Sequence, residues 1–153
     1  MIKILSFLFI VVTSNVFSQE ISFEQKAFEF YCDSILTGKE PKGSLKICPV
    51  VQDFNYWWTE CQSKFGLQQM DTVRGAVPED IPKITLKSDK RFKKVNVFRK
   101  GDYPVIFVIA RLYFDKKIYV TVVETYAGKG INYLFKMNAE GVIEDWCKGS
   151  WTD

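Results

Sequence analysis

Apolar side chains recur at helical spacing in the first part of the chain. From Phe23 to Ile35 they return every three or four residues, and this period predicts a helix over about 23–37. The helix start is also marked, because Ser22 followed three residues later by Gln25 has the form of a capping box. In that motif the serine hydroxyl accepts the Gln25 backbone N–H, and the glutamine side chain reaches back toward the serine.

A second helical stripe follows a loop-like stretch that is punctuated by glycine and proline. Asp53 can cap this helix and Gly66 can end it, so the pattern predicts a helix from about 53 to 65. The apolar positions that share one face are Phe54, Trp57, Trp58, Cys61 and Phe65. Core packing is the ordinary explanation for such a stripe.

From residue 83 onward the period changes from helical to alternating, which is typical of strands. The segments that alternate or are apolar throughout are 83–87, 95–99, 105–114, 118–126, 131–137 and 142–146. Asn138 to Gly141 has the composition of a tight turn between the last two segments. This order predicts an α+β domain in which two N-terminal helices pack on one face of a curved antiparallel sheet of about six strands. The order resembles that of the cystatin-like and nuclear-transport-factor-like cones.

The loop between the third and fourth of these strands decides which side chains share a face. An odd loop of three residues, 115–117, places two apolar sets together: Ile106, Val108, Ala110, Leu112 and Phe114 with Ile118, Val120 and Val122. A one-residue slip turns every side chain over, so burial favours this register. The same register continues the buried face to Glu124 and places Arg111 on the opposite face.

The first residues have the organisation of a cleavable secretion signal. Lys3 precedes a nine-residue, almost wholly apolar run, and Val16 and Ser18 are suitably placed before a cut between residues 18 and 19. The run is shorter than the roughly 20 apolar residues that a membrane span needs. We therefore expect cleavage of residues 1–18 and a single globular domain over 19–153, secreted or periplasmic, without a membrane span. An uncleaved N-terminal anchor is the alternative.

Four cysteines, all beyond the predicted signal, favour disulfides in an exported chain. They allow three pairings, of which we favour Cys32–Cys48 and Cys61–Cys147. The first bond would close a short loop, and the second would tie the second helix to the end of the last strand. The spacing contains no C-x-x-C pair, so no metal site is predicted. Buried free thiols are the alternative.

The chain contains no histidine, which excludes a Ser-His-Asp triad, a Cys-His pair and an H-E-x-x-H zinc site. An enzyme built on this sequence would have to use carboxylates, lysine, tyrosine or a bare cysteine. No pair of carboxylates, phosphate-binding loop or cofactor motif stands out. The sequence therefore favours a protein without catalytic activity and without a cofactor, while it leaves an enzyme open.

Positive charge is concentrated in one segment of a chain whose net charge is only +3. Residues 83–100 hold eight Lys and Arg and a single acid, Asp89, and they coincide with the first predicted β-hairpin. Such a patch would attract a polyanion or an acidic protein surface, although it matches no nucleic-acid-binding motif and a nucleic acid is not favoured. The candidate anion-binding residues are Lys90, Arg91, Lys93 and Lys94. Alternatively, the lysines protect an exposed sheet edge from aggregation.

A cavity in the curved sheet would be a second kind of site. Its candidate ligand-binding residues are Trp57, Trp58, Glu124 and Tyr126. Aromatic pairs can stack on sugars or line a cavity, and a carboxylate on a buried face is a candidate functional group. The ordinary alternatives are core packing for the tryptophans and access to water for Glu124, which lies near a strand end.

Three functions are compatible with these patterns. The first is an exported binding domain without catalytic activity, which uses the basic hairpin or the sheet cavity. The second is a small enzyme that uses Glu124 and a tyrosine in that cavity, and the third is a structural envelope protein. The absence of histidine and of any catalytic motif favours the first.

Overall fold

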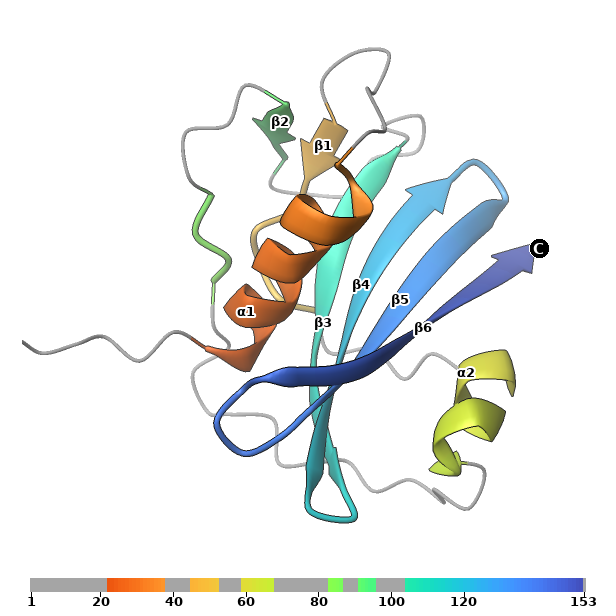
Figure 1. Cartoon of the computed structure of the whole chain (residues 1–153). Helices are drawn as coiled ribbons and strands as arrows, with labels where there is room; N and C mark the ends of the chain where they lie inside the picture. Colours follow the sequence, from red (N-terminus) through yellow and green to blue (C-terminus); the bar gives the residue numbers. More distant parts are fainter. Residues whose placement is uncertain are drawn as a thin grey trace, which may run out of the picture.

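The computed structural model describes residues 22–37, 45–52, 59–67, 83–86, 91–95 and 104–152. Its centre is a twisted six-stranded sheet in the order β2-β1-β3-β4-β5-β6 (Figure 1). The strands are β1 (Leu45–Ile47), β2 (Phe92–Lys94), β3 (Val105–Phe114), β4 (Lys117–Tyr126), β5 (Lys129–Met137) and β6 (Ile143–Thr152). The helical segments are α1 (Phe23–Phe30), its π-helical continuation η1 (Tyr31–Ile35), and α2 (Thr59–Phe65).

The α+β class with a six-stranded sheet is confirmed, but the sheet is mixed and not wholly antiparallel as predicted. Strands β3 to β6 are consecutive antiparallel neighbours, as hairpin connections require. Strand β1 instead pairs in parallel with both β2 and β3, so the sheet is mixed. Parallel neighbours need long crossover connections, and the chain between β1 and β2 is long enough to provide one.

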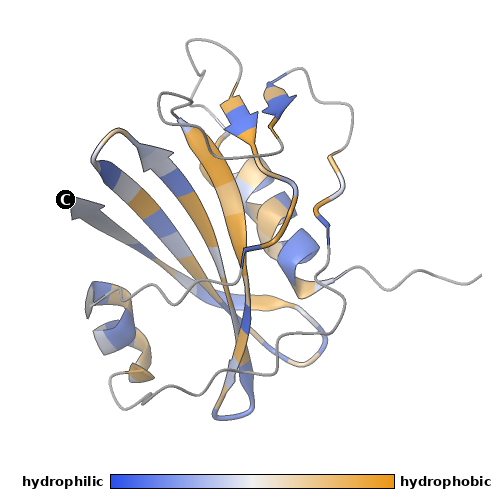
Figure 2. Ribbon diagram, turned by 180° about the vertical axis from the view of Figure 1, so that it is seen from behind, coloured by the Kyte–Doolittle hydropathy of each residue, from blue (hydrophilic) through white to orange (hydrophobic). Residues whose placement is uncertain are grey.

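The two helices lie on opposite faces of the sheet, not on one face as predicted. Helix α1 with η1 packs on the face that carries Val122 and Phe135, which we call the α1 face. Helix α2 packs on the face that carries Val123 and Leu134, which we call the α2 face. Strands β3 and β4 are buried at most positions, and β3 is apolar along most of its length (Figure 2). Strands that are buried on both sides need a cover on each face, and each helix provides one.

The N-terminus of α1 is capped as predicted, but only by half of the capping box. Ser22 Oγ accepts the Gln25 backbone N–H at 3.1 Å. The Gln25 side chain turns away from Ser22 toward segment 83–86, where Nε2 donates to the Thr85 carbonyl at 3.1 Å and Oε1 accepts the Thr85 N–H at 2.7 Å. The Gln25 amide therefore satisfies both backbone hydrogen-bonding groups of Thr85, as the backbone of a neighbouring strand would.

The predicted sharing of faces between β3 and β4 is right near Glu124 and wrong toward the turn, where Leu112 and Phe114 pack on the α2 face. Between Ile109 and Leu112 the register shifts, which leaves Ala110 and Arg111 opposite the single residue Val120. This is a β-bulge, in which one strand contributes an extra residue. The extra residue brings Arg111 to the α1 face, so its predicted place on the opposite face is wrong.

The β3–β4 loop has two residues, not three. Asp115 and Lys116 both have positive φ, 45° and 58°, and Phe114 pairs with Lys117. Positive φ at both central residues defines a type I′ turn, whose twist matches that of the strands. The two-residue turn and the extra residue of the bulge offset each other, so the same side chains share a face near Glu124 as predicted. Phe114, which lies between the turn and the bulge, instead joins the core of the α2 face.

The described residues of the basic segment, 83–86 and 91–95, do not pair with each other as the predicted hairpin requires. In its described part, Lys83 makes an antiparallel bridge to Val50, and β2 pairs in parallel with β1. Lys93 and Lys94 are therefore exposed residues of an edge strand and not of a turn. Phe92 explains the difference, because its ring packs 5.8 Å from the ring of Phe28 and anchors β2 to the core under α1.

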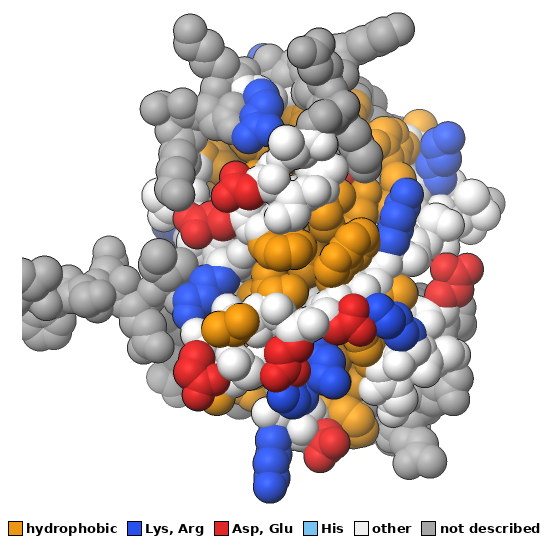
Figure 3. Space-filling view, in the orientation of Figure 1, with side chains coloured by type: hydrophobic (Ala, Val, Ile, Leu, Met, Phe, Trp, Pro, Cys, Tyr) orange, Lys and Arg blue, Asp and Glu red, His pale blue; other side chains and the backbone are white. Residues whose placement is uncertain are grey.

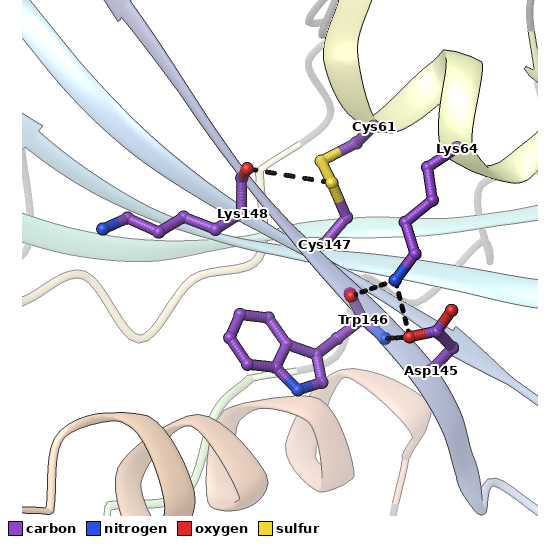
Figure 4. Close-up of a disulfide and its surroundings, with 6 residues drawn as sticks. All are labelled: Cys61, Lys64, Asp145, Trp146, Cys147 and Lys148. Carbon is purple, nitrogen blue, oxygen red and sulfur yellow. Dashed lines mark hydrogen bonds and ion pairs between the residues drawn. A yellow bond between two sulfur atoms is a disulfide. The ribbon is translucent and has the colours of Figure 1, made fainter.

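One of the two favoured disulfides is present. Cys61 of α2 is bonded to Cys147 of β6, with Cα atoms 5.6 Å apart (Figure 4). Cys32 and Cys48 are buried thiols, so the predicted bond between them is wrong. Cys32 belongs to the core of the α1 face and Cys48 to that of the α2 face, so the sheet separates them. Strand alternation is the cause, since Ile47 faces α1 and the next residue turns to the other side.

Several predictions fall on other parts of the chain. The predicted signal, residues 1–18, lies outside the described residues, as do Trp57, Trp58 and Lys90. Cleavage after residue 18 therefore stays a prediction. Within the described ranges, no helix has the length and apolar character that crossing a membrane requires.

Candidate functional site

Glu124 is a buried carboxylate near the end of β4. Its side chain is 6% exposed, and its neighbours across the sheet are Ile106 of β3 and Ile131 of β5. The alternation that buries Val122 on the α1 face also buries Glu124, two residues further on. A carboxylate in such surroundings needs hydrogen-bond donors, because an unsatisfied buried charge is very costly.

Two tyrosine hydroxyls donate to this carboxylate. Tyr31 Oη, from η1, lies 2.5 Å from Oε1, and Tyr126 Oη, from β4, lies 2.8 Å from Oε2. The predicted pair of Glu124 and Tyr126 is thus brought together, because residues two apart on a strand share a face. Tyr31 was not singled out from the sequence. It lies on the apolar stripe of the first helix, and its buried hydroxyl, which requires a partner, was the available signal.

The first helix changes from α-helical to π-helical geometry at Tyr31, the residue that donates to Glu124. Tyr31 is the first residue of the π-helical segment η1 and is fully buried. Single π-helical turns are rare and occur frequently at functional sites. The π-helical segment therefore marks the side of the helix that faces Glu124 as a candidate functional region.

A third tyrosine, Tyr133 of β5, completes the cluster. Its ring is 1% exposed and lies 5.2 Å from the ring of Tyr31. Burial raises the pKa of the Tyr133 hydroxyl, and the charge of Glu124 and a hydrogen bond to it raise this pKa further. We call Glu124 with Tyr31, Tyr126 and Tyr133 the Glu124 cluster.

The phenols of this cluster stay protonated through the neutral pH range. Burial, followed by the charge of Glu124 and the hydrogen bond to it, raises the pKa of Tyr31 far above its usual value. Burial and the hydrogen bond to Glu124 raise the pKa of Tyr126 to about 12. The cluster therefore consists of protonated donors around one carboxylate. Its evident effect is to fix η1 against β4 and β5.

Beside α1, part of the α1 face is open to solvent. Figure 3 shows hydrophobic side chains gathered at the centre of this face, next to α1. Trp146 of β6 is 38% exposed, and its ring lies 6.3 Å from the buried ring of Tyr133. Strand pairing and alternation place Lys148 and Ser150 on the same face, and both are exposed. We call Trp146, Lys148 and Ser150, with the partly exposed Tyr126, the open strip.

The backbone of Trp146 is held from the opposite side of the sheet. Its N–H donates to Asp145 Oδ1 at 2.7 Å, and its carbonyl accepts from Lys64 Nζ at 2.8 Å (Figure 4). The next residue, Cys147, is bonded to α2. In Figure 4 the indole extends toward α1, away from the disulfide. Contacts on the α2 face therefore fix the residue that presents an aromatic ring on the α1 face.

A second buried carboxylate, Glu24, was not singled out from the sequence. Its side chain is 0% exposed, and Oε1 accepts from the Arg111 backbone N–H at 3.2 Å and from Nε at 3.0 Å. The Arg111 guanidinium also lies 5.0 Å above the ring of Phe23, and among the described residues Glu24 Oε2 has no hydrogen-bond partner. The β3 bulge created this pair by turning Arg111 toward α1. Its evident role is to join α1 to the sheet.

Three of the predicted anion-binding residues, Arg91, Lys93 and Lys94, lie in the described part of the chain, and these three do not converge on one point. Lys93 and Lys94 are consecutive residues of a strand, so their side chains point to opposite sides. Arg91 is only partly exposed, with its guanidinium 5.6 Å from the ring of Phe92, and it lines a pocket that also contains carboxylates. The described part of the basic segment therefore resembles a protected edge more than a binding cluster.

Comparisons with protein families, with curated proteins and with solved structures find no match for this chain. The likeness to cystatin-like and nuclear-transport-factor-like cones is therefore not confirmed. Within the described part of the chain, no group of three or more Cys, Asp and Glu side chains is placed to hold a metal ion. Function has to be inferred from the geometry of the α1 face.

Proposed function

We propose that this chain is an exported binding domain without catalytic activity, and that its ligand lies on the open strip. The observation that carries this proposal is Trp146, which is 38% exposed and whose ring lies 6.3 Å from the buried ring of Tyr133, at an interplanar angle of 45°. A partly exposed aromatic ring that also contacts a buried neighbour can stack on a ligand. Rigid support also limits the entropy that ligand binding costs.

An acidic glycan is the ligand that suits this strip best. A sugar ring can lay its C–H face on Trp146. The Tyr126 hydroxyl, which donates to Glu124, can accept a hydrogen bond from a sugar hydroxyl, and the Ser150 hydroxyl can donate or accept one. Lys148 supplies one positive charge on the same face, which favours a sugar that carries a carboxylate or sulfate. The partner would thus be a polyanion, although not one that binds through the basic segment.

A small enzyme at Glu124 has less support from the geometry. A general base must come within hydrogen-bond reach of the proton that it takes from a substrate. Both oxygens of Glu124 already accept tyrosine hydroxyls, and only 6% of the residue is exposed. These contacts suit a positioning role, in which Glu124 fixes the tyrosines that lie beside and beneath the open strip.

Export is the second element of the proposal. The Cys61–Cys147 disulfide is compatible with an extracellular or periplasmic location, where such bonds form and persist. Export also agrees with the signal-like pattern of residues 1–18. Mass spectrometry of the exported protein should find a chain that begins at Gln19. A dominant species that retains Met1 would contradict this element.

Retention on immobilised heparin, with uncharged dextran as a reference, tests the glycan site. We expect Trp146→Ala to weaken heparin retention by about tenfold in affinity, since stacking contributes on the order of 1 kcal/mol or more. Tyr113→Ala is the matched control, because Tyr113 is 46% exposed and lies outside the strip. Lys148→Gln should make retention less sensitive to salt. Equal retention of wild type and Trp146→Ala would refute the proposed site.

A further inference from the structure

Strand β6 is an outer edge of the sheet, with no strand beyond it among the described residues (Figure 1). In a strand, the N–H and C=O of one residue point to the same side, and successive residues alternate. The Trp146 N–H and carbonyl are bonded to the side chains of Asp145 and Lys64 and not to β5, so they point outward. The later residues of β6 that share this orientation are Lys148, Ser150 and Thr152.

The opposite end of the sheet gives the same orientation. The Ile106 carbonyl of β3 accepts from the Cys48 N–H, on the side away from β4. Hydrogen-bonded and non-hydrogen-bonded pairs alternate along a row of an antiparallel sheet, and Ile106 shares its row with Glu124, Ile131 and Ser150. Following that row to β6 again points the Ser150 backbone outward.

The first half of this edge is closed by side chains at Trp146, whereas the second half is open. Lys148, Ser150 and Thr152 are exposed, and within the described part of the chain their outward backbone groups make no hydrogen bond. The Lys148 carbonyl lies 3.7 Å from Cys147 Sγ, but a disulfide sulfur has no proton to donate. An open edge of this kind is a template for pairing with another strand.

The side chains on the α2 face of this half leave room for a further strand. Cys147 is bonded to α2, and Gly149 has no side chain. The Trp151 ring lies over Gly130 of β5, in the space that a Cβ there would occupy, so it is turned inward and away from the edge. A further strand can therefore lie beside residues 148–152.

We propose that this further strand is the same segment of a second copy of the chain, paired antiparallel around Ser150. In this register Ser150 lies opposite Ser150 of the partner subunit, and Lys148 lies opposite Thr152 of the partner subunit. On the α2 face, Gly149 lies opposite the bulky Trp151 of the partner subunit. Such an isologous contact uses one patch twice, so the edge has to complement only itself.

Two independent features select this register. A pairing centred on Lys148 would place two lysines directly opposite each other, which is destabilising. A pairing centred on Gly149 would place Trp146 opposite Thr152 of the partner subunit, although the Trp146 backbone groups are already bonded. The pairing centred on Ser150 separates the lysines, engages every open residue and does not need Trp146.

This pairing would join the two open strips into one face. Residues that lie opposite each other in a sheet share a face, so Trp146, Lys148 and Ser150 of both copies lie on the α1 side of one continuous sheet. A long acidic glycan can then engage two strips at once, which raises its overall affinity. This consequence rests on the proposed function, whereas the pairing itself does not.

Sedimentation velocity of the mature chain without glycan, from micromolar to millimolar concentration, tests the pairing. We expect a monomer–dimer equilibrium. Thr152→Pro should raise its dissociation constant by about tenfold or more, because proline has no N–H and both symmetry-related hydrogen bonds are lost. Proline is tolerated on an edge strand where the N–H faces solvent, so the monomer should stay folded, which circular dichroism checks. Thr152→Val keeps the N–H and is the matched control, which should dimerise as the wild type does.

Cysteine cross-linking tests the register, and it does not depend on the proline variant. Ser150→Cys should give a covalent dimer on mild oxidation with copper phenanthroline, because the Cα atoms of a hydrogen-bonded antiparallel pair lie about 5.5 Å apart, within disulfide range. Lys148→Cys should stay at the level of the wild type, because the two copies of this residue lie at opposite ends of the pairing. Equal cross-linking of both variants, or of Lys148→Cys alone, would overturn the register.

Heparin retention separates the pairing from the glycan site. Thr152→Pro, which lies outside the open strip, should be retained more weakly than Thr152→Val, since only the dimer engages heparin with both strips. Equal retention of these two variants would overturn the joined face. A chain that stays monomeric at every concentration would overturn the pairing itself, even if its edge then bound an extended acidic peptide. The Trp146→Ala test of the glycan site would remain valid in that case.

Discussion

The two faces of the sheet hold their helices by different chemistry. On the α1 face the attachment is non-covalent: Glu24 binds Arg111 of β3, and Tyr31 binds Glu124 of β4. On the α2 face the attachment is a covalent bond between α2 and β6. The same buried strands, β3 and β4, lie between them.

The lengths of the helices explain this difference. Helix α1 has eight residues and η1 adds five, and together they contribute several fully buried side chains to the core. Helix α2 has seven residues, and a helix of that length is not stable by itself. Lys64 adds two contacts at the surface, with Nζ 2.7 Å from Asp145 Oδ1 and 2.8 Å from the Trp146 carbonyl, and the hydrogen bond to Asp145 lowers the pKa of that carboxyl. The α1–η1 helix is held by packing and polar contacts, and the described part of α2, which is shorter, is held by a disulfide as well.

The largest effect should come from removing that disulfide. The variant Cys61→Ser with Cys147→Ser should lose about 4 to 5 kcal/mol of the free energy of unfolding, since the bond closes a loop between residues 86 apart. Guanidinium denaturation measures the loss. Cys32→Ala is the control, because this thiol is outside the bond and non-reducing peptide mapping should still recover Cys61–Cys147. A loss below about 1 kcal/mol would show that α2 is held by packing after all.

Breaking the charged attachment of α1 should cost somewhat less. Arg111→Met leaves Glu24, which is 0% exposed, as an unpaired buried carboxylate, and the expected loss is about 3 kcal/mol. Adding Glu24→Gln to this variant should recover part of that loss, because the charge that was left unpaired is gone. Urea denaturation of the two single variants and the double variant measures the coupling. Strict additivity would contradict a direct interaction.

The Glu124 cluster should be worth about 2 kcal/mol per hydrogen bond. Tyr31→Phe removes one hydroxyl from the buried carboxylate and keeps the ring, so the free energy of unfolding should fall by roughly 1.5 to 3 kcal/mol. Tyr113→Phe removes a hydroxyl from a residue that is 46% exposed, and it should change stability by less than about 0.5 kcal/mol. If the two substitutions had equal effects, the cluster would not stabilise the α1 face.

The same cluster predicts a loss of stability at alkaline pH. The pKa of Tyr126 is about 12 in the folded chain, whereas an unperturbed tyrosine, as in the unfolded chain, has a pKa of 10.0. As the pH rises, the unfolded chain therefore loses this proton first. The stability from this group is complete below pH 10 and is lost as the pH rises toward about 12. Thermal melting between these values should show the decline, and Tyr126→Phe should make it shallower. An unchanged slope in that variant would contradict the assignment.

The smallest change in stability is expected at the sheet edge. Lys93→Ser with Lys94→Ser should alter the free energy of unfolding by no more than about 0.5 kcal/mol per site, because both residues are exposed. Light scattering should nevertheless rise, since lysines on an edge strand prevent pairing with other chains. Lys129→Ser, an exposed change in the β4–β5 hairpin, is the control. Loss of heparin retention without aggregation would instead support binding through the basic segment.

The sequence by itself determined the elements whose signals are local. The range of β3, the Ser22 cap and the end of α2 before Gly66 all depend on side-chain periodicity or backbone preferences within a few residues. The hairpins from β3 to β6 follow from short turns, and adjacent strands pair most easily when the loop is short. The Cys61–Cys147 bond could also be predicted, because the helical stripe shows that Cys61 faces the core.

Only the tertiary structure decided which distant groups meet. The periodicity of an isolated strand is the same whether its far face meets water or a second helix, so the placement of α1 and α2 on opposite faces was not readable. The β3 bulge depends on a partner strand, and it alone turned Arg111 toward Glu24. The hydrogen bond between Tyr31 and Glu124 joins residues 93 positions apart, and it likewise exists only because η1 packs on β4. Periodicity assigns a side chain to a face of its own element, but its partner is set by the packing of elements that are far apart in sequence.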